Sequence, residues 1–177
     1  RSGAPPLSRQ PPHQPFSPVD SRRTSGLLLP VSALPSRYGI GDLGPAAFQF
    51  ADLLTRTNQR LWQVLPVGPI GPGASPYSSP STFAGNPLLI SPEPLVEDGL
   101  LTEDDLAPLT ELPADHVDYA RLVPRKRKVL RTAFRRFRAD VSTPEATRVQ
   151  QFRASQSAWL DDYALYAALK DAHGGSA

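Results

Sequence analysis

Two short apolar runs, separated by an amphipathic segment, predict a strand–helix–strand unit near the start of the chain. SGLLLP at 25–30 and LWQVL at 61–65 are nearly continuous in apolar residues, which is typical of strands in a parallel sheet covered on both faces. Between them, Pro45 begins a predicted helix that ends near Asn58. Its expected buried face carries apolar residues at helical spacing: Ala47, Phe50, Ala51 and Leu54. Parallel strands need such a crossover, so the pattern indicates a βαβ unit.

Beyond the second strand the pattern turns mostly helical. Residues 88–94 are expected to form a short extended piece, and Thr102 is a candidate N-cap with acids in the first turn after it. A helix after Pro124, within 121–140, should bury Val129, Leu130, Ala133, Phe134 and Phe137. Two more helices are predicted, one from Thr143 to about Ser155 and one over 159–171 that Gly174 ends, with an apolar side at Trp159, Tyr163, Tyr166, Ala167 and Leu169.

The segment 66–87, PVGPIGPGASPYSSPSTFAGNP, carries no charged residue and is rich in Gly, Pro and Ser. Connections of that length are usually functional or disordered, and disordered ones are normally charged and poor in aromatic residues. We therefore expect a rigid neutral loop. It follows the second strand, and the loop 31–44 follows the first, so both should lie at the carboxyl edge of the sheet, where ligands bind in parallel β/α folds.

This neutral loop offers candidate ligands for a neutral, hydroxyl-rich molecule. Tyr77 provides an aromatic face that can stack on a sugar ring, Ser75 provides a hydroxyl, and Asn86 provides an amide held before a proline. The alternative is a loop packed for its own sake, with prolines for stiffness and Phe83 as its core. The chemistry of the residues alone leaves the two interpretations equal.

Charge is balanced overall, with a net charge of +2, but it is unevenly distributed. Residues 93–118 are acidic, and RLVPRKRKVLRTAFRRFR at 121–138 is basic without an acid. The basic stretch could bind a nucleic acid backbone. Its apolar residues repeat at helical spacing, however, so we favour an amphipathic helix whose basic side contacts the acidic segment or solvent. For this reason we predict no nucleic acid binding. We also predict no membrane binding, since no apolar run is long enough to span a bilayer.

Other patterns do not assign catalytic chemistry. GIGDLG at 39–44 fits a dinucleotide fingerprint in spacing, but it does not follow a strand directly and no acid lies at the ribose position. We expect these glycines to allow tight turns, with Asp42 able to cap the next helix. The adjacent carboxylates Asp104/Asp105 and Asp161/Asp162 point apart on a helix and are expected to be solvated. With no Cys and three isolated His residues, we assign no catalytic residue, no cofactor and no metal.

Several strings carry a family resemblance in a fixed order over about 23–170. These are SGLLLPVSALPSRYGIGDLGPAAFQFADLL, QRLWQVLPVGP, SPYSSPSTFAGNPLLIS, LVEDGLL, VDYARLVPRKRKVL and WLDDYALYAALK. Together they resemble the N-terminal part of the 4-α-glucanotransferases, the amylomaltases and disproportionating enzymes of glycoside hydrolase family 77. SPY…FAGNP after WQVLP is the most specific of them.

The resemblance implies a (β/α)8 barrel and a retaining transfer of α-1,4-glucan segments between malto-oligosaccharides, with no cofactor. It implies that Ser75 and Tyr77 contact the glucan, that Gly85 and Asn86 shape the loop, and that the catalytic carboxylates lie downstream of this chain. Pro72 and Ala74 depart from the family pattern, which often has an aromatic residue and an acid there. A non-catalytic glucan-binding or regulatory protein is the alternative function.

The expected organisation has three parts. Residues 1–24 form a disordered Pro/Ser/Arg-rich arm, 25–94 the first βα units of the barrel with the neutral loop 66–87 as substrate loop, and 95–177 a mainly helical insertion or continuation. No Met occurs, even at position 1, so we expect a fragment whose strands are unpaired and which is poorly soluble alone. We expect a cytoplasmic protein, with the plastid stroma as the alternative because the arm resembles a transit-peptide remnant.

Overall fold

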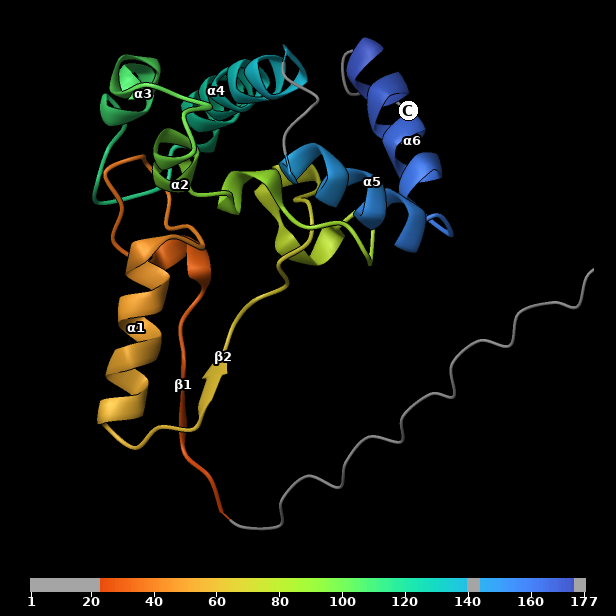
Figure 1. Cartoon of the computed structure of the whole chain (residues 1–177). Coiled ribbons are helices and arrows are strands. Elements are labelled where there is room, and N and C mark those ends of the chain that lie inside the picture. Colours follow the sequence, from red (N-terminus) through yellow and green to blue (C-terminus); the bar gives the residue numbers. More distant parts are fainter. Residues whose placement is uncertain (1–22, 140–143, 174–177) are drawn as a thin grey trace, which may run out of the picture.

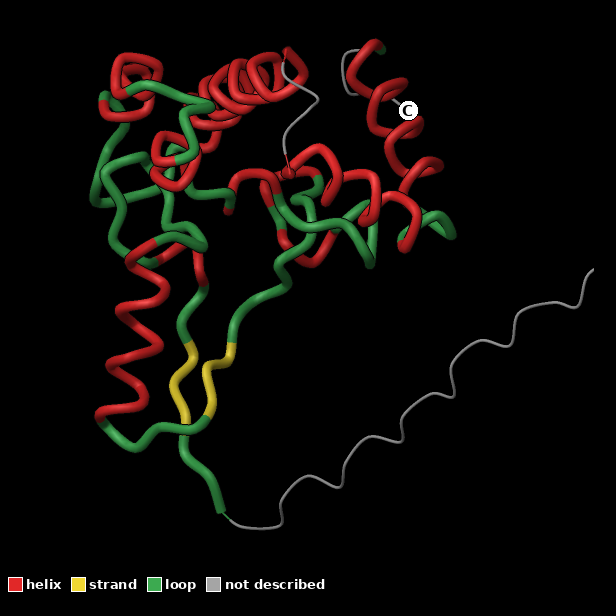
Figure 2. The backbone as a smooth tube through the Cα atoms, viewed as in Figure 1, coloured by secondary structure: helices red, strands yellow, loops and turns green. Residues whose placement is uncertain are grey.

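The computed structural model describes residues 23–139 and 144–173. The predicted arm over 1–24, except for its last two residues, lies outside the described residues, as do Thr143 and Gly174. The predicted strand–helix–strand unit is confirmed: β1 (Gly26–Leu28) leads to α1 (Pro45–Arg56), which returns to β2 (Leu61–Gln63). The two strands are parallel, with Gly26 opposite Leu61, and α1 runs alongside them (Figures 1 and 2).

The strands are more exposed than the apolar runs predicted. Leu28 is 58% exposed and Leu61 is 55% exposed, so the expectation of a sheet covered on both faces is wrong for the described part of the chain. One side is covered by α1, where Phe50 meets Trp62 edge to face with ring centroids 4.9 Å apart. The Trp62 indole also donates to the Leu29 carbonyl at 2.8 Å and so ties the two strands together.

The core lies above the sheet, where the loop after β1 meets a helical layer (Figure 1). This layer contains α2 (Pro92–Glu97), α3 (Glu103–Thr110) and α4 (Tyr119–Ala139). Its most deeply buried apolar side chains are Leu106, Leu109 and Leu122. The prediction of an extended piece over 88–94 is wrong, because prolines at first-turn positions begin a 3-10 helix, Pro87–Leu89, and then α2.

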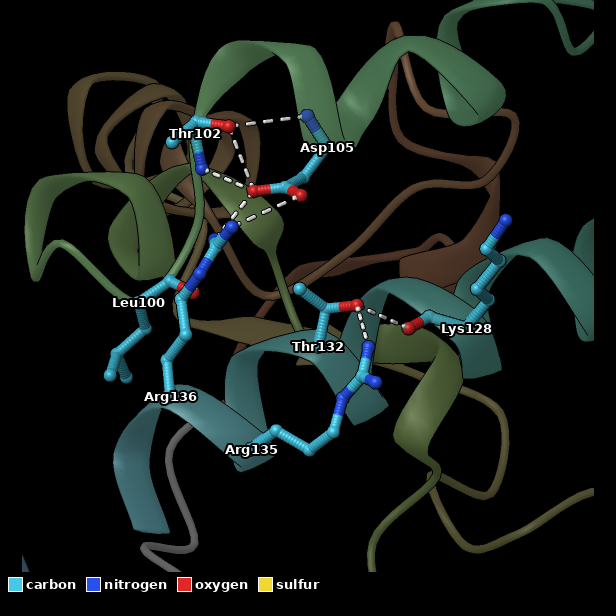
Figure 3. A network of polar contacts seen from close by, with 7 residues as sticks. All are labelled: Leu100, Thr102, Asp105, Lys128, Thr132, Arg135 and Arg136. Atoms are coloured by element: carbon cyan, nitrogen blue, oxygen red, sulfur yellow. Dashed lines mark hydrogen bonds and ion pairs between the residues drawn. The ribbon is translucent and has the colours of Figure 1, made fainter. Parts of the chain in front are cut away.

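Helix α3 begins as predicted. The Thr102 hydroxyl accepts from the Asp105 backbone N–H at 3.4 Å, and the Asp105 carboxylate accepts from the Thr102 N–H at 2.8 Å, which makes a capping box. Arg136 of α4 then pairs with the same carboxylate at 2.5 and 3.3 Å (Figure 3). Arg125 likewise pairs with Glu111 at 3.0 Å. The predicted contact between the basic helix and the acidic segment is confirmed.

Two details of α4 differ from the prediction. The helix starts at Tyr119, where Asp118 accepts from the Arg121 N–H at 3.1 Å, so Pro124 lies inside the helix rather than before it. The buried face also differs, since Phe134 is 56% exposed and the buried positions are Leu122, Lys126, Val129 and Ala133. A lysine at a core position looks polar in a hydrophobic pattern, and this shifted the predicted face.

The last two helices, α5 (Pro144–Ser155) and α6 (Leu160–Ala172), lie on the far side of the neutral loop from α1 (Figure 1). Their bounds agree with the prediction. Asp171 near the end of α6 accepts hydrogen bonds from both Arg127 and Arg131 of α4. None of the side chains of α6 is fully buried, so this helix is attached mainly through that clamp and through aromatic contacts at its start.

Candidate functional site

The loops after the two strands lie at the same end of the strand pair, as predicted from their order (Figure 1). One backbone hydrogen bond ties the first loop to the 3-10 turn that follows the neutral loop: the Leu43 N–H donates to the Leu89 carbonyl at 2.9 Å. The neutral loop closes on itself where the Asn86 N–H donates to the Val67 carbonyl at 2.8 Å. Both loops therefore lie at the carboxyl edge of the βαβ unit, as predicted, and the neutral loop forms a bounded structure there.

The neutral loop is held by a series of tight turns. Its middle contains two short 3-10 helices, Pro72–Ala74 and Pro76–Ser78, each with proline in its first turn. Ala74 has a positive φ of 58°, which is uncommon for a residue with a side chain. A Cβ at Gly71 would lie 2.0 Å from the Ser78 carbonyl oxygen, so only glycine allows these two turns to meet. These features support the expectation of a rigid loop.

Ser75 and Tyr77 stand together at the start of the second turn. The Ser75 hydroxyl accepts from the Tyr77 N–H at 3.3 Å and thereby caps the turn, while its own O–H remains able to donate. The Tyr77 side chain is 74% exposed, and among the residues that the structure describes it makes no ring contact or hydrogen bond. The pair presents a free aromatic face beside a hydroxyl donor.

Asn86 begins the third turn. Its Oδ1 accepts from the Leu88 N–H at 3.0 Å, which orients the side chain and leaves the Nδ2 amide as a donor. Asn86 lies on the border of a hollow of about 940 Å³, whereas Ser75 and Tyr77 do not line it. The structure therefore places the three predicted residues on one loop but not in one cavity.

The packed-loop alternative named Phe83 as the core of the loop, and this detail is wrong. Phe83 is 70% exposed, and its ring stacks on Trp159 with centroids 5.7 Å apart. Trp159 in turn lies 6.2 Å from the Tyr163 ring. The aromatic residue of the loop reaches outward to the start of α6 instead of filling the loop.

Sequence reasoning missed the other side of the hollow. It is formed by side chains of α4 and α6, among them Tyr119, Val123, Arg127 and Tyr163. Tyr119, Val123 and Arg127 recur at four-residue spacing, so the helical period was the available signal. They were overlooked because the sequence does not show that α4 lies across from the neutral loop.

Tyr38 and Asp42 of the loop 31–44 have structural roles. Tyr38 is 2% exposed and Asp42 is 5% exposed, and burial raises the pKa of both groups. The prediction that Asp42 caps α1 is wrong, since the N-cap is Gly44 and the Asp42 carboxylate accepts from the Gly44 N–H at 3.0 Å instead. Gly39 has a φ of 76°, which agrees with the turn interpretation of GIGDLG.

The paired carboxylates of the helices do not form a catalytic pair. Asp105 is bound by Arg136, and Asp161 is bound by Arg153 at 2.9 Å. Within 23–139 and 144–173, no three His, Cys, Asp or Glu side chains gather closely enough to hold a metal ion. In the same ranges no helix is both long and apolar enough to cross a membrane.

Comparison with known proteins gives one consistent result. Residues 29–177 match the family model described as 4-alpha-glucanotransferase. A 4-alpha-glucanotransferase of Synechocystis is 44% identical over 88% of this chain and 31% of its own length, and one from Thermus thermophilus is 46% identical over 86% of this chain and 30% of its own. The solved structure "Amylomaltase from Streptococcus agalactiae in complex with acarbose" superposes with a TM-score of 0.79 at 35% identity, over 88% of this chain and 31% of that one. The chain thus spans about a third of the length of these relatives.

Proposed function

The chain belongs to the 4-alpha-glucanotransferase family, glycoside hydrolase family 77, and on this premise we propose that the protein transfers α-1,4-glucan segments between malto-oligosaccharides. We further propose that the described residues supply one side of the glucan site and no catalytic carboxylate. The observation that carries this proposal is the neutral loop, which is rigid and uncharged. It presents an exposed ring beside a hydroxyl donor at Tyr77 and Ser75, and an amide donor at Asn86 where the loop closes.

The chemistry of the loop suits a sugar. A glucose unit has an apolar ring face, which packs on an aromatic ring, and hydroxyls that exchange hydrogen bonds with neutral groups. Tyr77 is positioned for the first contact, while Ser75 and the Asn86 amide are positioned for the second. Because turns hold the backbone of the loop before the ligand arrives, little backbone entropy is lost on binding.

The expected reaction is a retaining transfer. One carboxylate forms a glycosyl-enzyme intermediate, a second acts as acid and base, and the incoming acceptor is another sugar rather than water. The residues of this chain contribute by holding the glucan in line for that reaction. No step requires a cofactor. The first βα units of a (β/α)8 barrel remain the proposed architecture, and a cytoplasmic location remains a prediction.

Incubating the full gene product with maltotriose tests the proposal. A transferase produces glucose together with longer malto-oligosaccharides, which chromatography resolves. Release of glucose and maltose without longer products would contradict a transferase. Binding of malto-oligosaccharide without turnover would favour the alternative of a non-catalytic glucan-binding protein.

The assignment of Tyr77 has its own test. Tyr77→Ala removes the ring and should raise the KM for maltotriose about five- to tenfold, towards the upper end of the range of about 0.5–1.5 kcal/mol that aromatic stacking contributes. Tyr77→Phe retains the ring and is the matched control, with a KM within about threefold of the wild type. An unchanged KM in Tyr77→Ala would contradict the assignment of this residue.

The basic helix offers little support for nucleic acid binding. Arg125 and Arg136 are engaged by the acidic segment, and Arg127 and Arg131 are both engaged by Asp171. Guanidinium groups paired in this way must give up those contacts before they neutralise phosphates.

A further inference from the structure

Lys126 is buried in the interior of the helical layer. It is 0% exposed and occupies the inner face of α4 between Leu122 and Val129. Its Nζ makes no hydrogen bond to any described residue. Burying an ammonium group is costly unless an opposite charge compensates it, so a lysine at such a position needs an explanation that packing alone does not provide.

The compensating charge is Asp42, at the end of the loop after β1. Burial lowers the pKa of Lys126 to about 8, and the negative charge of Asp42 acts against that decrease. Burial raises the pKa of Asp42, and the positive charge of Lys126 acts against that increase. Each group therefore helps to keep the other charged inside the protein.

Ser91 completes the cluster. It is 7% exposed, and its hydroxyl has no hydrogen-bond partner of acceptable geometry in the described chain. A Cβ built on Gly44 would meet both the Ser91 Oγ, at 2.2 Å, and the Asp42 Oδ1, at 2.8 Å. The serine and the carboxylate thus converge on the space that a glycine leaves open.

The cluster joins three segments that are distant in sequence. Asp42 belongs to the loop after β1 and Lys126 to α4. Ser91 is the N-cap of α2, two residues after the 3-10 turn that Asn86 caps. Next to Asp42 in the chain, the Leu43 N–H donates a hydrogen bond to the Leu89 carbonyl. A short covalent and hydrogen-bonded path therefore leads from Asp42, through Leu43 and Leu89, to the closing end of the neutral loop at Asn86.

We propose that Lys126 is a positioning residue for glucan binding: paired with Asp42 beside Ser91, it sets the place of the closing end of the neutral loop, and so of Asn86, against α4. The inference rests on the proposed function of that loop. Lys126 does not touch the glucan and acts through Asp42, whose carboxylate lies beside Ser91. A leucine or methionine would fill the same volume, but only a charge pair fixes the orientation of a polar loop end in an apolar layer.

The test compares Lys126→Met, Asp42→Asn and the double variant in the full gene product. We expect each single variant to raise the KM for maltotriose about tenfold while kcat stays within about twofold. The double variant should raise it by no more than either single one, because both remove the same pair. Lys128→Met, an exposed neighbour on α4, is the matched control and should leave both constants unchanged.

Affinity for maltoheptaose, measured by calorimetry on the same variants, gives a reading that does not depend on turnover. Ser91→Ala removes a single hydroxyl and serves if Lys126→Met does not fold; we expect a two- to threefold rise in KM. Unchanged KM and affinity in the folded variants would overturn the positioning role while leaving the transferase function intact. Multiplicative effects in the double variant would also overturn it. A wild-type protein that neither transfers nor binds maltoheptaose would overturn both proposals.

Discussion

The capping box of α3 permits a quantitative prediction for Asp105→Asn. The carboxylate accepts from the Thr102 N–H and hydroxyl, each at 2.8 Å, and pairs with Arg136, which also donates to the Leu100 carbonyl at 3.1 Å (Figure 3). The side chain is 22% exposed, so solvent screens these contacts only in part. Asparagine keeps the shape and an acceptor oxygen but loses the charge.

The magnitude follows from the pKa. Hydrogen bonds from Arg136, followed by those from Thr102, lower the pKa of Asp105 from 3.8 to about 2. At about 1.36 kcal/mol per pH unit this shift sets an upper bound of about 2.4 kcal/mol at neutral pH, and screening by solvent at the exposed Arg136 reduces it to about 2 kcal/mol. Asparagine retains neutral versions of some of these bonds, so we expect a loss of about 1.5 kcal/mol, which is a decrease of roughly tenfold in the protection of α3 amides from exchange.

The stability that the Asp105 carboxylate contributes changes with pH in one direction only. A carboxyl whose pKa is lower in the folded state stabilises the protein above its unfolded pKa of 3.8, and this contribution disappears as pH falls towards 2. The wild type and Asp105→Asn should therefore differ most at pH 5–7 and only slightly at pH 2.

Hydrogen exchange followed by mass spectrometry, corrected for intrinsic exchange rates, measures the stability of α3 in each variant. Asp104→Asn is the control because its carboxylate lies in the same turn and makes no side-chain hydrogen bond to the described part of the chain. It should change protection by less than about threefold. Equal effects at positions 104 and 105, or a difference at position 105 that persists at pH 2, would refute the reasoning.

Three further predictions concern the core, the clamp and the neutral loop. Leu122→Ala should lower stability by about 2–5 kcal/mol, because Leu122 is 0% exposed. Leu165→Ala, at a position 61% exposed, should lower stability only slightly. Amide protection measured in the two variants tests this difference. Asp171→Asn should lower the stability of α6 by about 1 kcal/mol at low salt, because it removes the charged partner of Arg127 and Arg131. An electrostatic clamp predicts that amide protection in the variant and the wild type becomes equal in 1 M NaCl. Gly71→Ala should raise the KM for maltotriose strongly, because its Cβ would meet the Ser78 carbonyl. Gly85→Ala, whose Cβ meets nothing within 4 Å, should leave the KM unchanged. Equal KM values in the two variants would contradict the rigidity of the loop.

The elements with a clear local signal could be predicted from the sequence. The apolar runs located β1 and β2, Pro45 located the start of α1, and Thr102 located the cap of α3. Their determinants lie within a few residues of each other. The carboxyl-edge placement of the neutral loop could also be predicted, since it follows from strand order alone.

The remaining features depend on contacts between distant segments. The basic stretch gives no local sign that Lys126 is buried, because its compensating charge, Asp42, lies 84 positions earlier. Pro124 suggested a helix start, but Asp118 begins the helix before it. Tyr119 and Tyr163 border the hollow only because α4 and α6 lie across from the neutral loop, and no local pattern specifies that arrangement.

The two tryptophans of the chain occupy separate environments and can serve as optical reporters. Trp62 donates to the Leu29 carbonyl between the strands, whereas Trp159 stacks on Phe83 of the neutral loop and donates to Gln156 at 2.8 Å. A Trp62→Phe variant would emit from Trp159 alone and report on the contact between the loop and α6, and Trp159→Phe would report on the strand pair. Fluorescence titration with a malto-oligosaccharide could then show which half of the chain responds to sugar, without any label.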